Sequence, residues 1–123
     1  MIFVCPCGVF IMGQINLSDY RNIYLETAKE YANNIFSGYS KLSANSQDKE
    51  AVAAIHLSAH SLKGQSQIMG FTNIVNLCEG VEESLEDILK GVDKVDDNFV
   101  ALLKKSVDDI NLELSLIEKG NIT

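Results

Sequence analysis

A nucleophilic site is indicated by His60 together with Lys63 and Gly64, which follow it by three and four positions. Residues three and four positions apart share one flank of an α-helix, so the Lys63 ammonium and the bare Gly64 would lie beside the imidazole. A neutral imidazole is a nucleophile, and a nearby cation stabilises an anionic group that it accepts. Because a glycine in mid-helix costs about 1 kcal/mol relative to alanine, we expect Gly64 to keep a patch of surface open for close approach.

A carboxylate further along the chain could orient this histidine. If two helices form a hairpin around residue 71, positions equally distant from it lie level, and His60 and Glu82 lie eleven positions before and after it. A carboxylate at that level would accept a hydrogen bond from the imidazole Nδ1–H and leave the Nε2 lone pair facing solvent. Together these residues predict a site at which His60 accepts a phosphoryl group, with Lys63 near its negative charge.

The segments that carry these residues are predicted to be α-helices, because apolar residues recur at intervals of three and four from position 17 onward. A first helix should start at Ser18 and Asp19, which are good N-cap residues, and should end near Gly38. The polar stretch 40–48 then predicts a loop. The side chains of this helix expected to face the core are Tyr20, Ile23, Tyr24, Thr27, Tyr31 and Ile35.

Three further helices follow. The second should stop at Gly70, the third should be capped by Thr72, and the fourth should run from about Asp97. Their expected core positions are, helix by helix, Val52, Ile55, Ala59, Leu62, Ser66 and Met69; Val75, Cys78, Val81, Leu85 and Ile88; and Val100, Leu103, Val107, Ile110, Leu114 and Ile117. We therefore predict an all-α fold, an antiparallel up-down four-helix bundle over residues 17–120. Since such bundles serve many functions, the function must be argued from the site.

The composition fits one acidic globular domain. The chain has 123 residues, of which 46% are hydrophobic and 22% are charged, and its formal net charge is -7. Acids and bases balance over residues 1–78, so the whole excess lies in 79–123. A DNA or RNA binder needs a basic face, so the charge excludes a general nucleic-acid-binding function. The sequence has no Gly-rich phosphate loop, nucleotide-binding signature or Ser–His–Asp arrangement, so we expect no enzyme activity from the chain on its own.

Residues 1–16 are expected to be a peripheral N-terminal arm. They are rich in apolar residues but have no Lys or Arg and no small-residue cleavage site, so they do not resemble a signal peptide. They are too short to span a bilayer, which takes ~20 apolar residues. Cys5 and Cys7 offer too few ligands for a zinc site, and 3 cysteines without framework spacing indicate a reducing compartment. We therefore expect a cytoplasmic protein without membrane insertion or bound metal.

The motif His60-Ser61-Leu62-Lys63-Gly64, the turn Gly70-Phe71 and the later Glu82 together resemble the histidine-containing phosphotransfer (HPt) family. Within this family they are most similar to the N-terminal phosphotransfer domains of CheA-type chemotaxis histidine kinases. The resemblance implies an HPt-like bundle in which His60 is phosphorylated on Nε2. It also implies that Glu82 bonds the other ring nitrogen and that Lys63 assists the phosphoryl group.

The resemblance further implies a phosphocarrier in a two-component relay. A histidine kinase catalytic domain would transfer the ATP γ-phosphoryl group to His60, and an aspartate of a response-regulator receiver domain would remove it. The chain would need no cofactor, would act as a monomeric carrier and kinase substrate, and could be part of a CheA-type kinase. Gly64, Gln67 and Glu79 are expected to line the flank on which a partner docks. Many relatives carry a histidine where this chain has Glu79, which could instead pair with Lys63.

A second histidine leaves an alternative function open. His56 and His60 are four positions apart and could form half of a metal site, with Glu79, Glu82 or Glu86 as a third ligand. The chain would then be a metal-binding bundle or an interaction bundle that is not phosphorylated. Such a site would not explain the mid-helix glycine, so we expect His56 to be a solvated residue on the flank. The acids expected to form only a solvated face are Glu83, Glu86 and Asp87.

Overall fold

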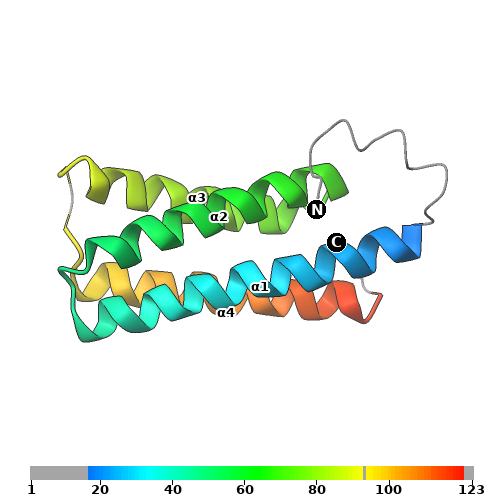
Figure 1. Ribbon diagram of the computed structural model, residues 1–123, viewed down its shortest axis with the longest axis horizontal. Helices are drawn as coiled ribbons and strands as arrows, with labels where there is room; N and C mark the ends of the chain where they lie inside the picture. The colour runs from blue at the N-terminus through cyan, green and yellow to red at the C-terminus, as the bar shows by residue number, and fades with distance from the viewer. Residues whose placement is uncertain (1–16, 93, 121–123) are drawn as a thin grey trace.

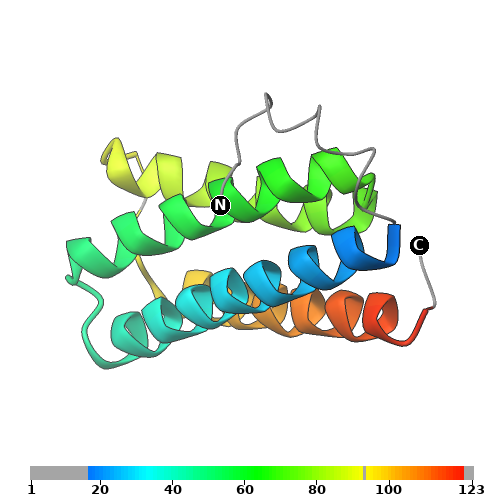
Figure 2. The ribbon, with the colours of Figure 1, turned by 45° about the vertical axis from the view of Figure 1, so that its right-hand side comes forward.

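The structure is a computed structural model that describes residues 17–92 and 94–120. The predicted arm over residues 1–16 lies outside the described residues. The described residues form no strand and fold into α1 (Leu17–Ala44), α2 (Lys49–Met69), α3 (Thr72–Leu89) and α4 (Asp97–Glu118). These helices run up and down in turn, with α2 and α3 in one layer and α1 and α4 in the other (Figure 1 and Figure 2). The predicted antiparallel four-helix bundle is confirmed.

A hydrophobic core lies between the two layers and corrects two of the predicted positions. Ile23 is 53% exposed, because α1 instead turns Leu25 and Ala28 inward. In α3, Ile74 is fully buried where the pattern predicts Val75, which is only half-buried. The predicted core residues that are buried are Tyr24, Ile35, Val52, Ile55, Ala59, Leu62, Ser66, Cys78, Val81, Leu85, Leu103, Val107, Ile110, Leu114 and Ile117. Those that are half-buried at its edge are Tyr20, Thr27, Tyr31, Met69, Ile88 and Val100.

Gly38 does not end the first helix, contrary to the prediction. It is buried inside α1, which continues to Ala44, so the loop to α2 is shorter than the predicted stretch 40–48. A Cβ atom at this position would clash with Cγ1 of Ile55, a fully buried side chain of α2. The glycine is therefore required by the close approach of α1 to α2 and not by a turn.

We expect Gly38→Ala to lower the free energy of unfolding by about 1–3 kcal/mol, because the added methyl group overpacks the contact with Ile55. The matched variant is Gly80→Ala in α3, where glycine is exposed and an added Cβ would meet nothing within 4 Å. That variant should gain about 0.5–1 kcal/mol from helix propensity. Urea unfolding followed by circular dichroism measures both changes, and equal effects of the two substitutions would contradict this explanation of Gly38.

The turn between α2 and α3 sets the register of the two helices that carry the candidate site. Gly70 has a left-handed φ of 79°, and the N–H of Phe71 donates to the carbonyl oxygen of Ser66 at 3.0 Å. Thr72 does not cap α3 as predicted. Since Phe71 is buried and anchors the turn, the chain is already helical at Thr72. Positions equally distant from residue 71 on the two helices therefore lie level.

No helix among the described residues is both long enough and apolar enough to cross a membrane.

Candidate functional site

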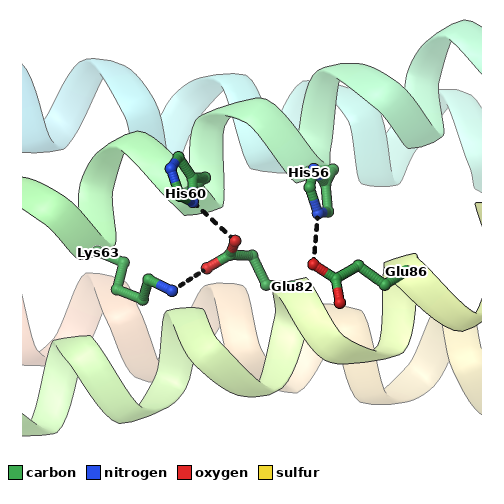
Figure 3. A network of polar contacts seen from close by, with 5 residues as sticks. All are labelled: His56, His60, Lys63, Glu82 and Glu86. Atoms are coloured by element: carbon green, nitrogen blue, oxygen red, sulfur yellow. Dashed lines mark hydrogen bonds and ion pairs between the residues drawn. The ribbon is translucent and has the colours of Figure 1, made fainter.

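His60 of α2 and Glu82 of α3 meet between the two helices (Figure 3). His60 Nδ1 lies 2.8 Å from Glu82 Oε2. An ionised carboxylate can only accept a hydrogen bond, so the Nδ1–H of the neutral imidazole is the donor and the proton stays on that nitrogen. The His60 side chain is 63% exposed, and Figure 3 shows its other ring nitrogen directed away from Glu82. Nε2 therefore keeps its lone pair on an accessible side of the ring.

The Glu82 carboxylate is more deeply placed than its position beside the core stripe predicts. Its side chain is only 8% exposed, and its other oxygen, Oε1, lies 2.8 Å from Lys63 Nζ. Burial by itself raises the pKa of Glu82, but the contacts with Lys63 and His60 outweigh it and hold the pKa below its ordinary value. The contact with Glu82 likewise raises the pKa of Lys63. At neutral pH both groups are charged, and Glu82 presents a fixed anion to the imidazole.

Lys63 has a different partner from the one that its level on the hairpin suggests. It lies level with Glu79, yet its ammonium pairs with Glu82, one helical turn further along α3. The flexible four-carbon stem of lysine spans that distance, and the buried carboxylate is the better partner because it is less screened by water. Glu79 is exposed and contributes only its charge to raising the pKa of Lys63. In this structure Lys63 therefore pairs with Glu82 and keeps its carboxylate ionised and oriented.

A second histidine and glutamate meet one helical turn away from the first pair. His56 Nε2 lies 3.4 Å from Glu86 Oε2, and both residues are equally distant from residue 71 (Figure 3). The His56 side chain is 27% exposed, so it is not the solvated flank residue that the sequence predicts. Glu86 is half-buried beside it, whereas Glu83 and Asp87 are exposed as predicted. The two histidines point toward different carboxylates because each faces the residue level with it on α3.

The alternative metal site, in which His56 and His60 are both ligands, is not the group of ligand atoms that the described residues bring together. The described residues that bring ligand atoms together are His56, Glu82 and Glu86, with all three atoms within 4.8 Å of one another. His60 is not in this group, since its Nδ1 contacts Glu82. The exposed nitrogen of His60 is therefore left for other chemistry.

The flank beside His60 is open, and it carries two apolar residues that the sequence analysis missed. A Cβ atom on Gly64 would meet nothing within 4 Å, and Gln67 and Glu79 are exposed as a docking surface requires. Leu57 and Ile68 are 66% and 76% exposed. They lie seven positions before and four positions after Gly64, which places all three on one face of α2. Apolar residues at helical steps from Gly64, outside the core stripe, were the signal that could have found them.

Comparison with known proteins decides the family. A family model for the Hpt domain matches residues 19–113, most of the chain. The chain belongs to the Hpt domain family. Histidine phosphotransfer in two-component signalling is therefore its function class.

Two relatives of the chain are chemotaxis proteins. The chain is 25% identical over 108 residues to the chemotaxis protein CheA of Bacillus subtilis, an alignment that covers 87% of this chain and 16% of that protein. It is 24% identical over 102 residues to the chemotaxis protein CheA of Halobacterium salinarum, covering 83% of this chain and 15% of the relative. The chain thus spans only a small part of the length of these relatives.

The fold of this Hpt domain is also that of a solved structure. The CheA phosphotransferase domain from Thermotoga maritima superposes with a TM-score of 0.79 at 24% sequence identity. The match covers 84% of this chain and 98% of the solved chain. The likeness shows that the whole solved domain and most of this chain share one helical architecture.

The lowered pKa of Glu82 predicts how the stability of this Hpt domain depends on pH. A carboxyl whose pKa is lower in the folded than in the unfolded state stabilises the fold above the unfolded-state pKa. That contribution is lost as the pH falls through the lower, folded-state pKa. The difference in unfolding free energy between the wild type and Glu82→Gln should therefore be largest at neutral pH and shrink on acidification. Urea unfolding of both proteins across this range measures it, and a difference that grows in acid would contradict the assignment.

Proposed function

We propose that this Hpt domain is a phosphocarrier of a two-component relay and that His60 is the residue that accepts the phosphoryl group. The observation that supports this most strongly is an exposed imidazole whose Nδ1 contacts the buried, ion-paired carboxylate of Glu82. Phosphorylation at Nε2 leaves the ring positively charged while Nδ1 keeps its proton. The Glu82 carboxylate, already in place 2.8 Å away, stabilises that charge as it develops.

Each transfer step exchanges one bond to phosphorus for another. In the first, the Nε2 lone pair of His60 attacks the γ-phosphorus of ATP bound to a histidine kinase catalytic domain. A P–N bond forms, the bond to the β,γ-bridging oxygen breaks, and ADP leaves with its electron pair. In the second, a carboxylate oxygen of a receiver-domain aspartate attacks the same phosphorus. The P–N bond breaks, its electron pair returns to Nε2, and the imidazole is neutral again.

We further propose that both partners dock on the open face of α2. Gly64 lets a partner approach the backbone closely, Leu57 and Ile68 supply apolar contacts, and Gln67 and Glu79 lie at the polar edge. Exposed apolar side chains around a functional group are common anchors at protein interfaces. In this proposal the chain is a monomeric cytoplasmic carrier and not a catalyst. Its kinase domain lies on another chain or elsewhere in a longer CheA-type polypeptide.

The docking face predicts a specific loss of transfer. Leu57→Asp should slow phosphoryl transfer from His60 to a receiver domain by about tenfold, which corresponds to about 1.4 kcal/mol of lost contact energy. The matched variant is Leu102→Asp in α4, since Leu102 is 65% exposed and Leu57 is 66% exposed. Because α4 lies diagonally across the bundle from α2, this variant should transfer at the wild-type rate. Stopped-flow measurement with phosphorylated protein compares them, and equal slowing in both variants would contradict the proposed face.

The proposed function is tested by reconstituting the relay. The chain is incubated with the catalytic domain of a CheA-type histidine kinase, ATP labelled on the γ-phosphate and Mg²⁺. We expect a label that is stable in base and labile in acid, as a phosphoramidate is. Addition of a chemotaxis receiver domain should then move the label to that domain. An unlabelled chain after incubation with an active kinase, or a label stable in acid, would contradict the proposal.

A further inference from the structure

A group of side chains with potential metal-ligand atoms extends from Glu82 in the direction away from His60. His56 of α2 and Glu82 and Glu86 of α3 each offer one ligand atom, and the three atoms lie within 4.8 Å of one another (Figure 3). The proposed relay uses Glu82 but gives no role to His56 or Glu86. Both of these side chains are held close together by the register of the α2–α3 hairpin rather than by a flexible loop.

The spacing of His56 and Glu86 suits two metal ligands better than a hydrogen bond. Their 3.4 Å separation between Nε2 and Oε2 is longer than a good N–H···O bond, which spans about 2.7–3.2 Å. A tetrahedral Zn²⁺ with bonds of about 2.0–2.2 Å to nitrogen and oxygen places neighbouring ligand atoms about 3.3–3.5 Å apart. The pair therefore already has the separation that a shared ion would require.

The third ligand is the buried carboxylate of Glu82, whose two oxygens each have one partner. The side chain of Glu82 is 8% exposed. Its Oε1 lies 2.8 Å from Lys63 Nζ and its Oε2 lies 2.8 Å from His60 Nδ1. Each carboxylate oxygen has two lone pairs, so each can take one further ligand. Two carboxylates and one imidazole carry a charge that attracts a divalent cation, and the imidazole favours Zn²⁺ over Mg²⁺ or Ca²⁺. Lys63 is the cation that opposes this binding.

We propose that His56, Glu82 and Glu86 form a binding site for a divalent transition-metal ion of the Zn²⁺ class. Occupation of this site acts on His60 through Glu82, a consequence that rests on the proposed function. Whichever oxygen of Glu82 the ion recruits, the ion withdraws negative charge from the carboxylate that orients and stabilises the imidazole. Metal binding therefore slows phosphorylation of His60.

Binding is tested first, without any kinase. Zn²⁺ is titrated into the full chain in competition with a chromophoric chelator, and the imidazole resonances of both histidines are followed by NMR. We expect one ion per chain, with the His56 resonances shifted most. His56→Gln should weaken binding at least about tenfold, and Glu86→Gln, which alters a more exposed residue, should do likewise. Lys63→Gln should strengthen it, because the opposing cation is gone.

The decisive control is His60→Gln, which removes the other imidazole and should leave Zn²⁺ binding intact. Binding that is lost in His60→Gln, or that is equally tight in His56→Gln, would overturn the site. The effect on phosphorylation is measured by the ratio of rates with and without Zn²⁺. That ratio should fall below one in the wild type and stay at one in His56→Gln. Because an action of Zn²⁺ on the kinase would lower the ratio in both proteins, the variant is the control for it. An unchanged wild-type ratio despite proven binding would overturn the regulatory step, and a chain never phosphorylated would overturn the proposed function alone.

Discussion

Replacing His60 with glutamine is expected to abolish phosphorylation of the chain by a CheA-type kinase. The amide of glutamine has no lone pair on nitrogen that is available for attack on phosphorus, so no P–N bond can form. Because the His60 side chain is 63% exposed, its removal opens no cavity in the core. The loss should therefore occur in a protein with the wild-type helical content and unfolding midpoint. Labelling with γ-labelled ATP, followed by autoradiography, measures it.

The His60→Gln variant still contains His56, so it also tests whether His56 can accept the phosphoryl group. That imidazole is half-buried, and its Nε2 faces Glu86 rather than solvent. If the label stayed in His60→Gln, the phosphoryl group would be on His56 or on a residue of another type, and His60 would not be the acceptor. If His60→Gln lost the label and also unfolded, His60→Asn would be tested in its place. The amide of asparagine reaches about as far as the Nδ1 of the histidine ring.

Replacing Glu82 with glutamine is expected to slow phosphorylation by about 10–100-fold without abolishing it. The amide keeps the shape of the carboxylate and can still accept from His60 Nδ1. It carries no charge, however, so it stabilises the developing positive charge of the ring far less. It also leaves Lys63 without its ion-pair partner, only 2.8 Å from the former Oε1 position. Single-turnover kinetics with a saturating concentration of the ATP-bound kinase domain separates this chemical effect from weaker docking.

The matched control is Glu83→Gln, which makes the same change of charge at the next position of α3. Glu83 is exposed, so its replacement should leave the rate near that of the wild type. Equal slowing in both variants would mean that the net charge of α3, and not the contact at Nδ1, sets the rate. Glu82→Asp is a third variant for comparison, because it keeps the negative charge but shortens the side chain that reaches His60 Nδ1.

The contact between His60 and Glu82 could be predicted from the sequence because it depends on two regular features. Helical periodicity sets which side chains flank the interface, and the Gly70-Phe71 turn fixes the register between the helices. Lys63 shows where this reasoning fails. A long side chain selects its partner by reach and by screening, so level alone pointed to Glu79 instead of the buried Glu82. The burial of His56 beside Glu86 depends on how closely the helices pack, which a one-dimensional pattern does not contain.

The role of Gly38 in the fold also depends on a contact that the local sequence does not contain. A glycine near the end of an apolar stripe is usually a stop, and nothing in the local sequence distinguishes a stop from a packing contact. The difference lies in Ile55, which approaches from another helix at a distance that only the folded structure determines. Gly70, in contrast, ends α2 as predicted, because its left-handed φ of 79° is a local property of the chain.

The proposed assignment is that Nε2 of His60 carries the phosphoryl group while Nδ1 donates to Glu82. It is tested most directly by long-range ¹H–¹⁵N correlation NMR of the phosphorylated chain, labelled with ¹⁵N in its histidines. The claim predicts phosphorus coupling to Nε2 of His60, a protonated Nδ1 on the same ring and unphosphorylated signals from His56. Phosphorus coupling to Nδ1 of His60, or to either nitrogen of His56, would contradict it.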